Sequence, residues 1–141
     1  MTPAALAQLH AVCFTTPRPW SQAEFDTLLH ARGVFLLTEP GGFLLGRVIA
    51  GEAELLTLAV DPNQRRAGIA RALVAAFHEE VKTHEAQTAF LEVADDNIAA
   101  RALYLATGWI ESGRRKAYYN SSDGTRRDAI IMVLPIDGAE G

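Results

Sequence analysis

The chain reads LLTLAVDPNQRRAGIA from Leu55 to Ala70, and this stretch decides the fold. Its first six residues are apolar and favour a strand, which Asp61-Pro62-Asn63 ends, because proline lacks a backbone donor and restricts the residue before it. Four apolar residues then recur at four-residue spacing, which predicts one face of a helix: Ile69, Leu73, Phe77 and Val81. The stretch therefore predicts a strand, a short basic loop and the N-terminus of a helix.

This predicted helix begins without a bulky side chain at its mouth, where Gly68 and Ala70 leave the backbone accessible. The first N–H groups of a helix have no helical partner and carry the positive end of its dipole, so the position suits a phosphate. The spacing is neither that of the Walker loop nor Gly-x-Gly-x-x-Gly. The alternative is a surface turn with solvated arginines.

Composition indicates a globular protein of 141 residues, with 49% apolar residues, 21% charged residues and a formal charge of −4. We expect a single domain over residues 1–141, with no membrane segment, no secretion signal and a cytoplasmic location. The negative charge argues against nucleic acid as a partner but tolerates a basic peptide. Cys13 is the single cysteine, so it forms no intrachain disulfide, and we expect it to pack as a small hydrophobe.

Local signals predict four helices and six strands. A capping box at Ser21 and Glu24 opens the second helix, and Gly33 is expected near its end. The predicted helices span 3–13, 22–33, 69–81 and 98–107; the predicted strands span 34–38, 43–50, 55–60, 88–93, 109–119 and 128–136. Three neighbouring antiparallel strands followed by a strand–helix–strand unit predict a mixed α/β fold, with a mostly antiparallel central sheet flanked by helices.

Three polar residues follow the phosphate loop at suggestive spacing. Glu92 is an ionisable group in an apolar strand, and Asn97 and Tyr104 lie about two helical turns apart on nearly one face. All three can border one cleft. The alternative is an exposed glutamate, a helix-capping asparagine and a core tyrosine.

The segment Arg65–Ala70 resembles the coenzyme A loop of the GNAT N-acetyltransferases. Further pieces are similar to the bacterial ribosomal-protein alanine N-acetyltransferases, the RimI type. They are Leu91-Glu92-Val93, Asn97, Ala102-Leu103-Tyr104, Gly108-Trp109, Tyr118-Tyr119, Asp123-Gly124 and Asp128–Met132. Relatives usually begin with a strand before the first helix, which this chain lacks or abridges.

The resemblance implies acetyl transfer from acetyl-CoA to the α-amine of a protein N-terminus. It assigns Glu92 as general base and Tyr104 as general acid. It places the coenzyme on the backbone of Leu58, Ala59 and Val60, on the loop Arg65, Arg66, Ala67, Gly68, Ile69, Ala70 and Arg71, and on Asn97. Tyr118, Tyr119 and Trp20 are candidates for the peptide groove.

No metal is expected, because the four histidines show no ligand spacing; His78 and His84 are expected on the solvent side. Tyr118 and Tyr119 are adjacent on a strand, so one of them should face the cleft and the other away from it. Two other functions stay open. One is acetylation of lysine side chains or small amines, with Asp95, Asp96 and Glu111 as candidates to hold the extra cation; the other is a non-catalytic acyl-CoA sensor.

Overall fold

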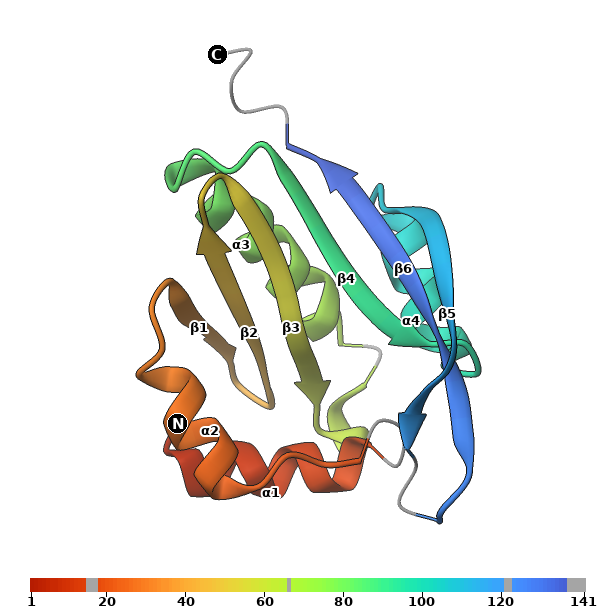
Figure 1. The fold of residues 1–141 in the computed structure, drawn as a ribbon. Coiled ribbons are helices and arrows are strands. Elements are labelled where there is room, and N and C mark those ends of the chain that lie inside the picture. The colour runs from red at the N-terminus through yellow and green to blue at the C-terminus, as the bar shows by residue number, and fades with distance from the viewer. Residues whose placement is uncertain (15–17, 66, 121–122, 137–141) are drawn as a thin grey trace.

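A six-stranded sheet runs through the molecule in a computed structural model, which describes residues 1–14, 18–65, 67–120 and 123–136 (Figure 1). The strands lie side by side in the order β1-β2-β3-β4-β6-β5. Their bounds are β1 (Val34–Glu39), β2 (Gly42–Ile49), β3 (Glu52–Val60), β4 (Thr88–Ala94), β5 (Ile110–Asn120) and β6 (Arg126–Pro135). Only β3 and β4 pair in parallel, so the predicted mixed and mostly antiparallel sheet is confirmed.

Helices cover both faces of this sheet. They are α1 (Pro3–Cys13), α2 (Gln22–Leu29), α3 (Ile69–Thr83) and α4 (Ile98–Ala106), with a short 3-10 turn at Pro62–Gln64. Leu44 packs in the hydrophobic cluster of α3 and α4, whereas its neighbours Phe43 and Leu45 pack with α1 and α2. Successive strand residues point to opposite faces, so the two clusters lie on opposite sides of the sheet. No helix within the described residues is long and apolar enough to span a bilayer.

The helix ends follow the local signals closely. Ser21 and Glu24 form the predicted capping box, but α2 ends at Leu29 and Gly33 closes the turn after it, with a φ of 78°. At the start of α4, Asn97 accepts a hydrogen bond from the backbone N–H of Ala100 at 3.2 Å. The helix α3 has no side-chain cap, since its N-cap is Gly68 in a left-handed conformation.

A bulge in β3 changes which side chains meet α1. Leu45 pairs with Thr57 and Gly46 pairs with Leu55, so Leu56 is the extra residue of this strand. Beyond the bulge Thr57 turns toward α1, where its hydroxyl contacts His10. The part of β3 that follows Thr57 is thereby anchored to α1.

Candidate active site

The strands β3 and β4 part along their length. They pair only at Glu52–Thr88, Ala53–Ala89 and Glu54–Phe90, and no further β3–β4 pair follows among the described residues. Figure 1 shows the two strands diverging toward the arrowhead of β3. Leu58, Ala59 and Val60 lie beyond the last pair, still bound to β2 on their other side. This parting leaves backbone groups of β3 available to an extended ligand.

The start of α3 offers a second set of backbone donors. The first helical hydrogen bond runs from the N–H of Ala72 to the carbonyl of Gly68 at 3.0 Å. The N–H groups of residues 69–71 therefore have no partner within the helix. A Cβ placed on Gly68 would meet no atom within 4 Å, so the approach is open. These residues fit a pyrophosphate, which backbone donors and the helix dipole both favour.

The loop side chains before α3 point largely to solvent. Arg65, Ala67 and Arg71 are exposed, and Ile69 and Ala70 pack partly against the main hydrophobic cluster. Arg66, also predicted to contact the coenzyme, lies outside the described residues. The loop thus presents backbone groups and exposed arginines to solvent, and no large side chain among the described residues closes it.

Cys13 lies beside this region and is half-buried. Its thiol donates a hydrogen bond to the carbonyl oxygen of Val60 at 3.2 Å. Burial raises the pKa of the thiol above its usual value. A protonated, hydrogen-bonded thiol agrees with the predicted packing role.

Glu92 lies on β4 and points away from α3 and α4. Its side chain is only 18% exposed, and its Oε2 atom has no hydrogen-bond partner. Burial raises the pKa of Glu92; the positive charge of Arg115 lowers it, and the negative charge of Glu54 raises it. Glu92 is therefore not the freely solvated strand residue of the alternative interpretation. A poorly solvated carboxylate is well suited to accept a proton.

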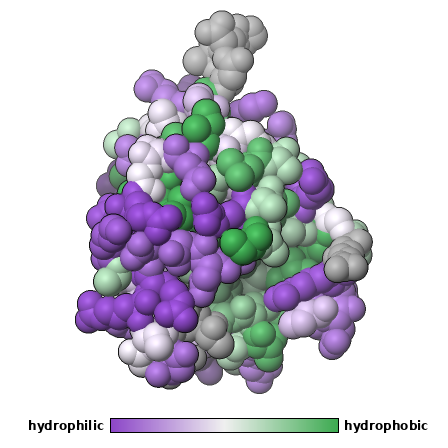
Figure 2. Space-filling model, turned by 90° about the vertical axis from the view of Figure 1, so that its right-hand side faces the viewer, coloured by the Kyte–Doolittle hydropathy of each residue, from purple (hydrophilic) through white to green (hydrophobic). Residues whose placement is uncertain are grey.

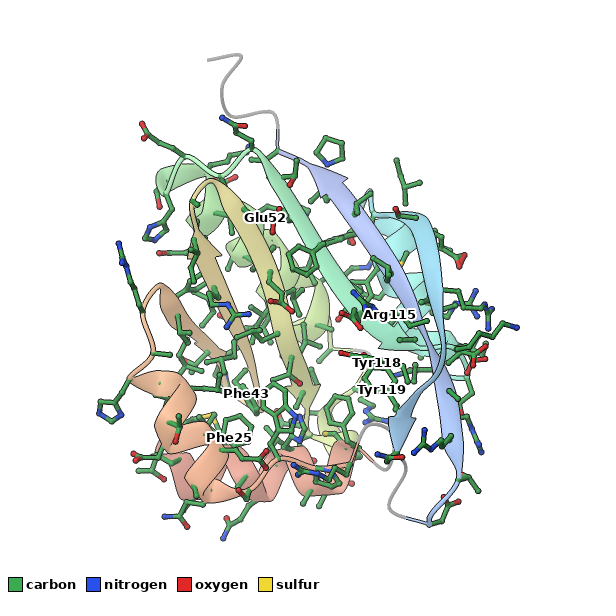
Figure 3. All side chains as sticks on the ribbon, viewed as in Figure 1. Phe25, Phe43, Glu52, Arg115, Tyr118 and Tyr119 are labelled. Carbon is green, nitrogen blue, oxygen red and sulfur yellow. The ribbon has the colours of Figure 1, made fainter. Side chains whose placement is uncertain are left out.

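Tyr119 lies beside Glu92. Burial raises the pKa of its hydroxyl, and the negative charges of Glu92 and Glu54 raise it further. Tyr118 is half exposed, and its ring lies 5.2 Å from that of Tyr119 between centroids. Figure 3 shows both tyrosines below Arg115 at the same part of the sheet.

The rings of the two tyrosines do not diverge to opposite sides of β5 as simple alternation predicts, and which of them faces the cleft stays a prediction. The register of β5 against β6 shifts between Arg115 and Tyr119, and Ala117 has a φ of 48°. This bulge interrupts the alternation of side chains, so the two rings touch. Asp128 holds the bulge by accepting a hydrogen bond from the N–H of Ala117 at 2.7 Å.

Tyr104 lies in the main hydrophobic cluster, with 6% of its surface exposed. Its ring packs edge-on against Trp109 at 5.9 Å, and burial raises the pKa of its hydroxyl. A negative charge on Tyr104 would raise the pKa of Tyr119. Tyr104 therefore occupies a core position in the cluster of α3 and α4. Asn97 likewise has a structural role as the N-cap of α4, which leaves its amide NH₂ for a ligand.

Residues 18–21, which precede α2, contact the end of β5. The backbone N–H of Arg18 donates to the carbonyl of Asn120 at the end of β5, at 3.2 Å. Trp20 is half-buried beside this contact and stacks on His10 at 5.1 Å. Trp20 and the two tyrosines therefore belong to segments that meet, although far apart in sequence.

The acidic residues that a lysine or polyamine site would use are already paired. Asp95 contacts Arg114 at 3.2 Å, Asp96 contacts Arg127 at 2.9 Å, and Glu111 contacts Arg101 at 3.0 Å. All lie in or beside α4, β5 and β6, the side seen in Figure 2, where hydrophilic side chains gather on the left and apolar ones to the right of centre. These pairs leave little net negative charge to hold a second cation.

Sequence reasoning missed three charged residues of the cleft: Arg47, Glu54 and Arg115. Glu54 pairs with Arg47 at 2.6 Å, and Arg115 lies 3.6 Å from Glu92. The alternation of Glu52 and Glu54 along β3 is a signal that both point to the face of Glu92. No local sequence signal finds Arg115, because its orientation follows from its pairing with Ala129 on β6.

No group of three or more metal-ligating side chains comes together within the described residues. His84 is exposed as predicted, but His78 is half-buried against Trp109, and its Nε2 atom has no hydrogen-bond partner among them. The expected solvent position of His78 is therefore wrong.

This combination of parted strands, open helix N-terminus and buried carboxylate is that of an acyl-CoA-dependent transferase. The sequence pattern of the acetyltransferase (GNAT) family matches residues 4–109, and the chain belongs to this family.

Two curated relatives and one solved structure are similar over most of the chain. A ribosomal protein bS18-alanine N-acetyltransferase from Escherichia coli is 41% identical over 122 residues, which is 84% of this chain and 82% of that protein. The N-alpha-acetyltransferase RimI of Mycobacterium tuberculosis is 34% identical over 125 residues, 82% of this chain and 77% of that protein. A crystal structure of the Escherichia coli ribosomal-protein alanine N-acetyltransferase superposes with a TM-score of 0.80 at 36% identity, covering 95% and 86% of the two chains.

Proposed function

We propose that this protein transfers the acetyl group of acetyl-CoA to the α-amine of a protein N-terminus, with the N-terminal alanine of ribosomal protein bS18 as its substrate. The observation that carries this proposal is Glu92, a largely desolvated carboxylate beside Tyr119 and near the parting of β3 and β4. The names of the similar proteins supply the substrate. A single cytoplasmic domain over residues 1–141, working without a metal, a nucleic acid or a membrane, completes the proposal.

Different residues along the cleft bind different parts of acetyl-CoA and the peptide substrate. Acetyl-CoA supplies an acetyl thioester. Backbone groups of Leu58, Ala59 and Val60 bind its arm and its carbonyl, and the N–H groups at the start of α3 bind the pyrophosphate, with Arg65, Arg66 and Arg71 nearby. The NH₂ group of Asn97 contacts the coenzyme. Trp20, Tyr118 and Tyr119 line the groove for the peptide.

Glu92 and Tyr104 move the protons. Glu92 accepts a proton from the substrate amine, directly or through water, as the amine attacks the acetyl carbon. Tyr104 donates its hydroxyl proton to the departing thiolate. An α-amine has a pKa of about 8, so roughly a tenth is neutral at pH 7, whereas a lysine amine near 10.4 is neutral about once in a few thousand. The rate of the reaction therefore depends only weakly on the base when the substrate is an N-terminus.

Substitution of Glu92 and Tyr104 tests these roles. We expect Glu92→Gln to lower kcat/KM at pH 7 by about 10- to 100-fold, with a smaller loss at pH 9, where the substrate amine is already neutral. Tyr104→Phe keeps the ring packing and should lower activity by a similar factor without recovery at high pH. Release of CoA thiol measures both. A Glu92→Gln loss that is equal at pH 7 and pH 9 would contradict the base role.

A panel of amines tests the substrate. It holds an Ala-starting peptide copied from the host's own bS18, an N-blocked lysine peptide and a polyamine. Turnover on the free alanine terminus alone supports the proposal. Turnover on the lysine peptide or the polyamine keeps the chemistry but overturns the ribosomal substrate. Binding of acetyl-CoA without turnover on all three would favour a sensor.

A further inference from the structure

Arg115 connects the proposed base to the proposed peptide groove. Its Nε atom lies 3.6 Å from Oε2 of Glu92, and its guanidinium carbon lies 5.3 Å from the centroid of the Tyr118 ring. The guanidinium is thus attracted at once by a carboxylate and by the face of an aromatic ring. Figure 3 shows Arg115 above Tyr118 and Tyr119 at the same part of the sheet.

The contact between Arg115 and Glu92 is electrostatic and easily broken. At 3.6 Å it is longer than a hydrogen bond, and Oε2 of Glu92 has no hydrogen-bond partner within the described part of the chain. The arginine side chain is 54% exposed. The preceding residue behaves differently: Arg114 is pinned between Asp128 at 2.7 Å and Asp95 at 3.2 Å.

We propose that Arg115 is the counter-ion of Glu92 in the empty site and gives up this place to the ammonium group of the incoming substrate. The inference rests on the proposed function, since it requires an amine to bind at Glu92. The side chain remains over the ring of Tyr118 while the ammonium approaches the carboxylate. Arg115 is therefore a positioning residue that acts through Glu92.

This exchange helps the reaction in two ways. In the empty site the positive charge of Arg115 keeps Glu92 ionised and ready to accept a proton. When the ammonium arrives, the neighbouring guanidinium disfavours a second positive charge and lowers the pKa of the amine. The proton then passes from the ammonium nitrogen to a Glu92 oxygen, directly or through water, and the neutral amine is the nucleophile.

Few other charged groups face Glu92. Glu54 on β3 opposes Arg115, because its negative charge raises the pKa of Glu92, although Arg47 partly neutralises it. Tyr119 on β5 stays neutral, since its pKa is raised, and Ile131 of β6 is the apolar pairing partner of Glu92. Among the described residues, Arg115 is the one cation within 4.0 Å of this carboxylate.

The test is the pH profile of kcat with the Ala-starting peptide, because kcat reports the ionisable groups of the enzyme–substrate complex. Removing a positive charge raises the pKa of both the carboxylate and the bound amine, so Arg115→Gln should move the acid limb to higher pH by about half a unit. Arg115→Lys should restore most of the wild-type profile, and high salt should shrink the difference. Glu54→Gln should move the limb to lower pH. Arg32→Gln, which removes an exposed arginine beyond α2, is the matched control and should leave the profile in place.

Carboxyl NMR of the free protein gives a readout without turnover. Glu92→Gln assigns the signal, and Arg115→Gln should raise the titration midpoint of Glu92. An unchanged midpoint would overturn the counter-ion role. A raised midpoint with an unchanged acid limb would overturn the transfer to the substrate amine. If the wild-type enzyme acetylates no N-terminus at all, the proposed function fails, while the NMR titration still decides whether Arg115 is the counter-ion.

Discussion

His10 is a single buried residue that joins three segments. It is 1% exposed; its Nδ1 atom accepts a hydrogen bond from the backbone N–H of Trp20 at 3.0 Å, and its Nε2 atom lies 3.0 Å from Oγ1 of Thr57. Because Nδ1 is an acceptor, the proton of the neutral ring is on Nε2, which donates to Thr57. Protonation of Nδ1 would break the bond to Trp20.

Acid should therefore destabilise the fold through His10. Burial lowers the pKa of His10 from 6.5 to about 4, so the unfolded chain binds more protons between these two values. We expect a loss of about 2 kcal/mol in the free energy of unfolding between pH 7 and pH 5 from this residue alone. Urea unfolding at both pH values measures it. His10→Gln should lack this part of the pH dependence and exposed His84→Gln should retain it; equal pH dependence in His10→Gln and wild type would contradict the prediction.

We expect the N-terminus of α3 to be the element that contributes most to coenzyme binding. Gly68 has a φ of 79°, a conformation that costs a residue with a Cβ about 1 kcal/mol. Gly51, in the turn between β2 and β3, has a φ of 80° and equally open surroundings. The two glycines thus have nearly the same backbone conformation but lie in different parts of the fold.

Substitution of these two glycines separates an effect on stability from an effect on coenzyme binding. Gly68→Ala and Gly51→Ala should each lower the free energy of unfolding by about 1 kcal/mol. Only Gly68→Ala should weaken acetyl-CoA binding, by about tenfold, because strain at this left-handed position shifts the backbone that leads into the N–H groups of residues 69–71. Urea unfolding and calorimetric titration measure the two effects. Equal affinity of both variants for acetyl-CoA would rule out the predicted pyrophosphate site.

At the scale of the whole molecule, the sheet is weakest where its two parts meet. One part holds β1, β2 and β3, the other β4, β6 and β5, and three residue pairs of β3 and β4 connect them in the sheet. The hydrophobic cluster beneath α3 spans both parts. The proposed coenzyme site includes residues of both β3 and α4, so we expect a bound ligand to stabilise the whole fold.

Acetyl-CoA should therefore raise the melting temperature. At a concentration of about 100 times its Kd, the stabilisation is about 2.7 kcal/mol, which corresponds to roughly 5–10 °C for a domain of this size. Differential scanning fluorimetry measures the shift, and Gly68→Ala should require more ligand for the same shift. Addition of EDTA should change neither the melting temperature nor the turnover; a fall in either would contradict the metal-free proposal.

Much of the fold and part of the site could be predicted from local signals. The capping box at Ser21, the break at Pro62 and the four-residue period of α3 each act within a few residues, so they specify elements before any packing occurs. The same holds for the open start of α3 and for Glu92, which stands out as an ionisable group in an apolar strand. The sequence by itself determined the elements, the mixed fold class and the open helix start at which we predict coenzyme binding.

Only the tertiary structure decided how distant residues meet. The place of β6 between β4 and β5 depends on pairing across the sheet, and the bulge at Ala117 depends on Asp128, eleven residues away. Pairing with β6 places Arg115 opposite Ala129, and the bulge after it brings the rings of Tyr118 and Tyr119 together, which no alternation rule predicts. The physical reason is that a strand orients its side chains by the partner it binds, and that partner is absent from the local sequence.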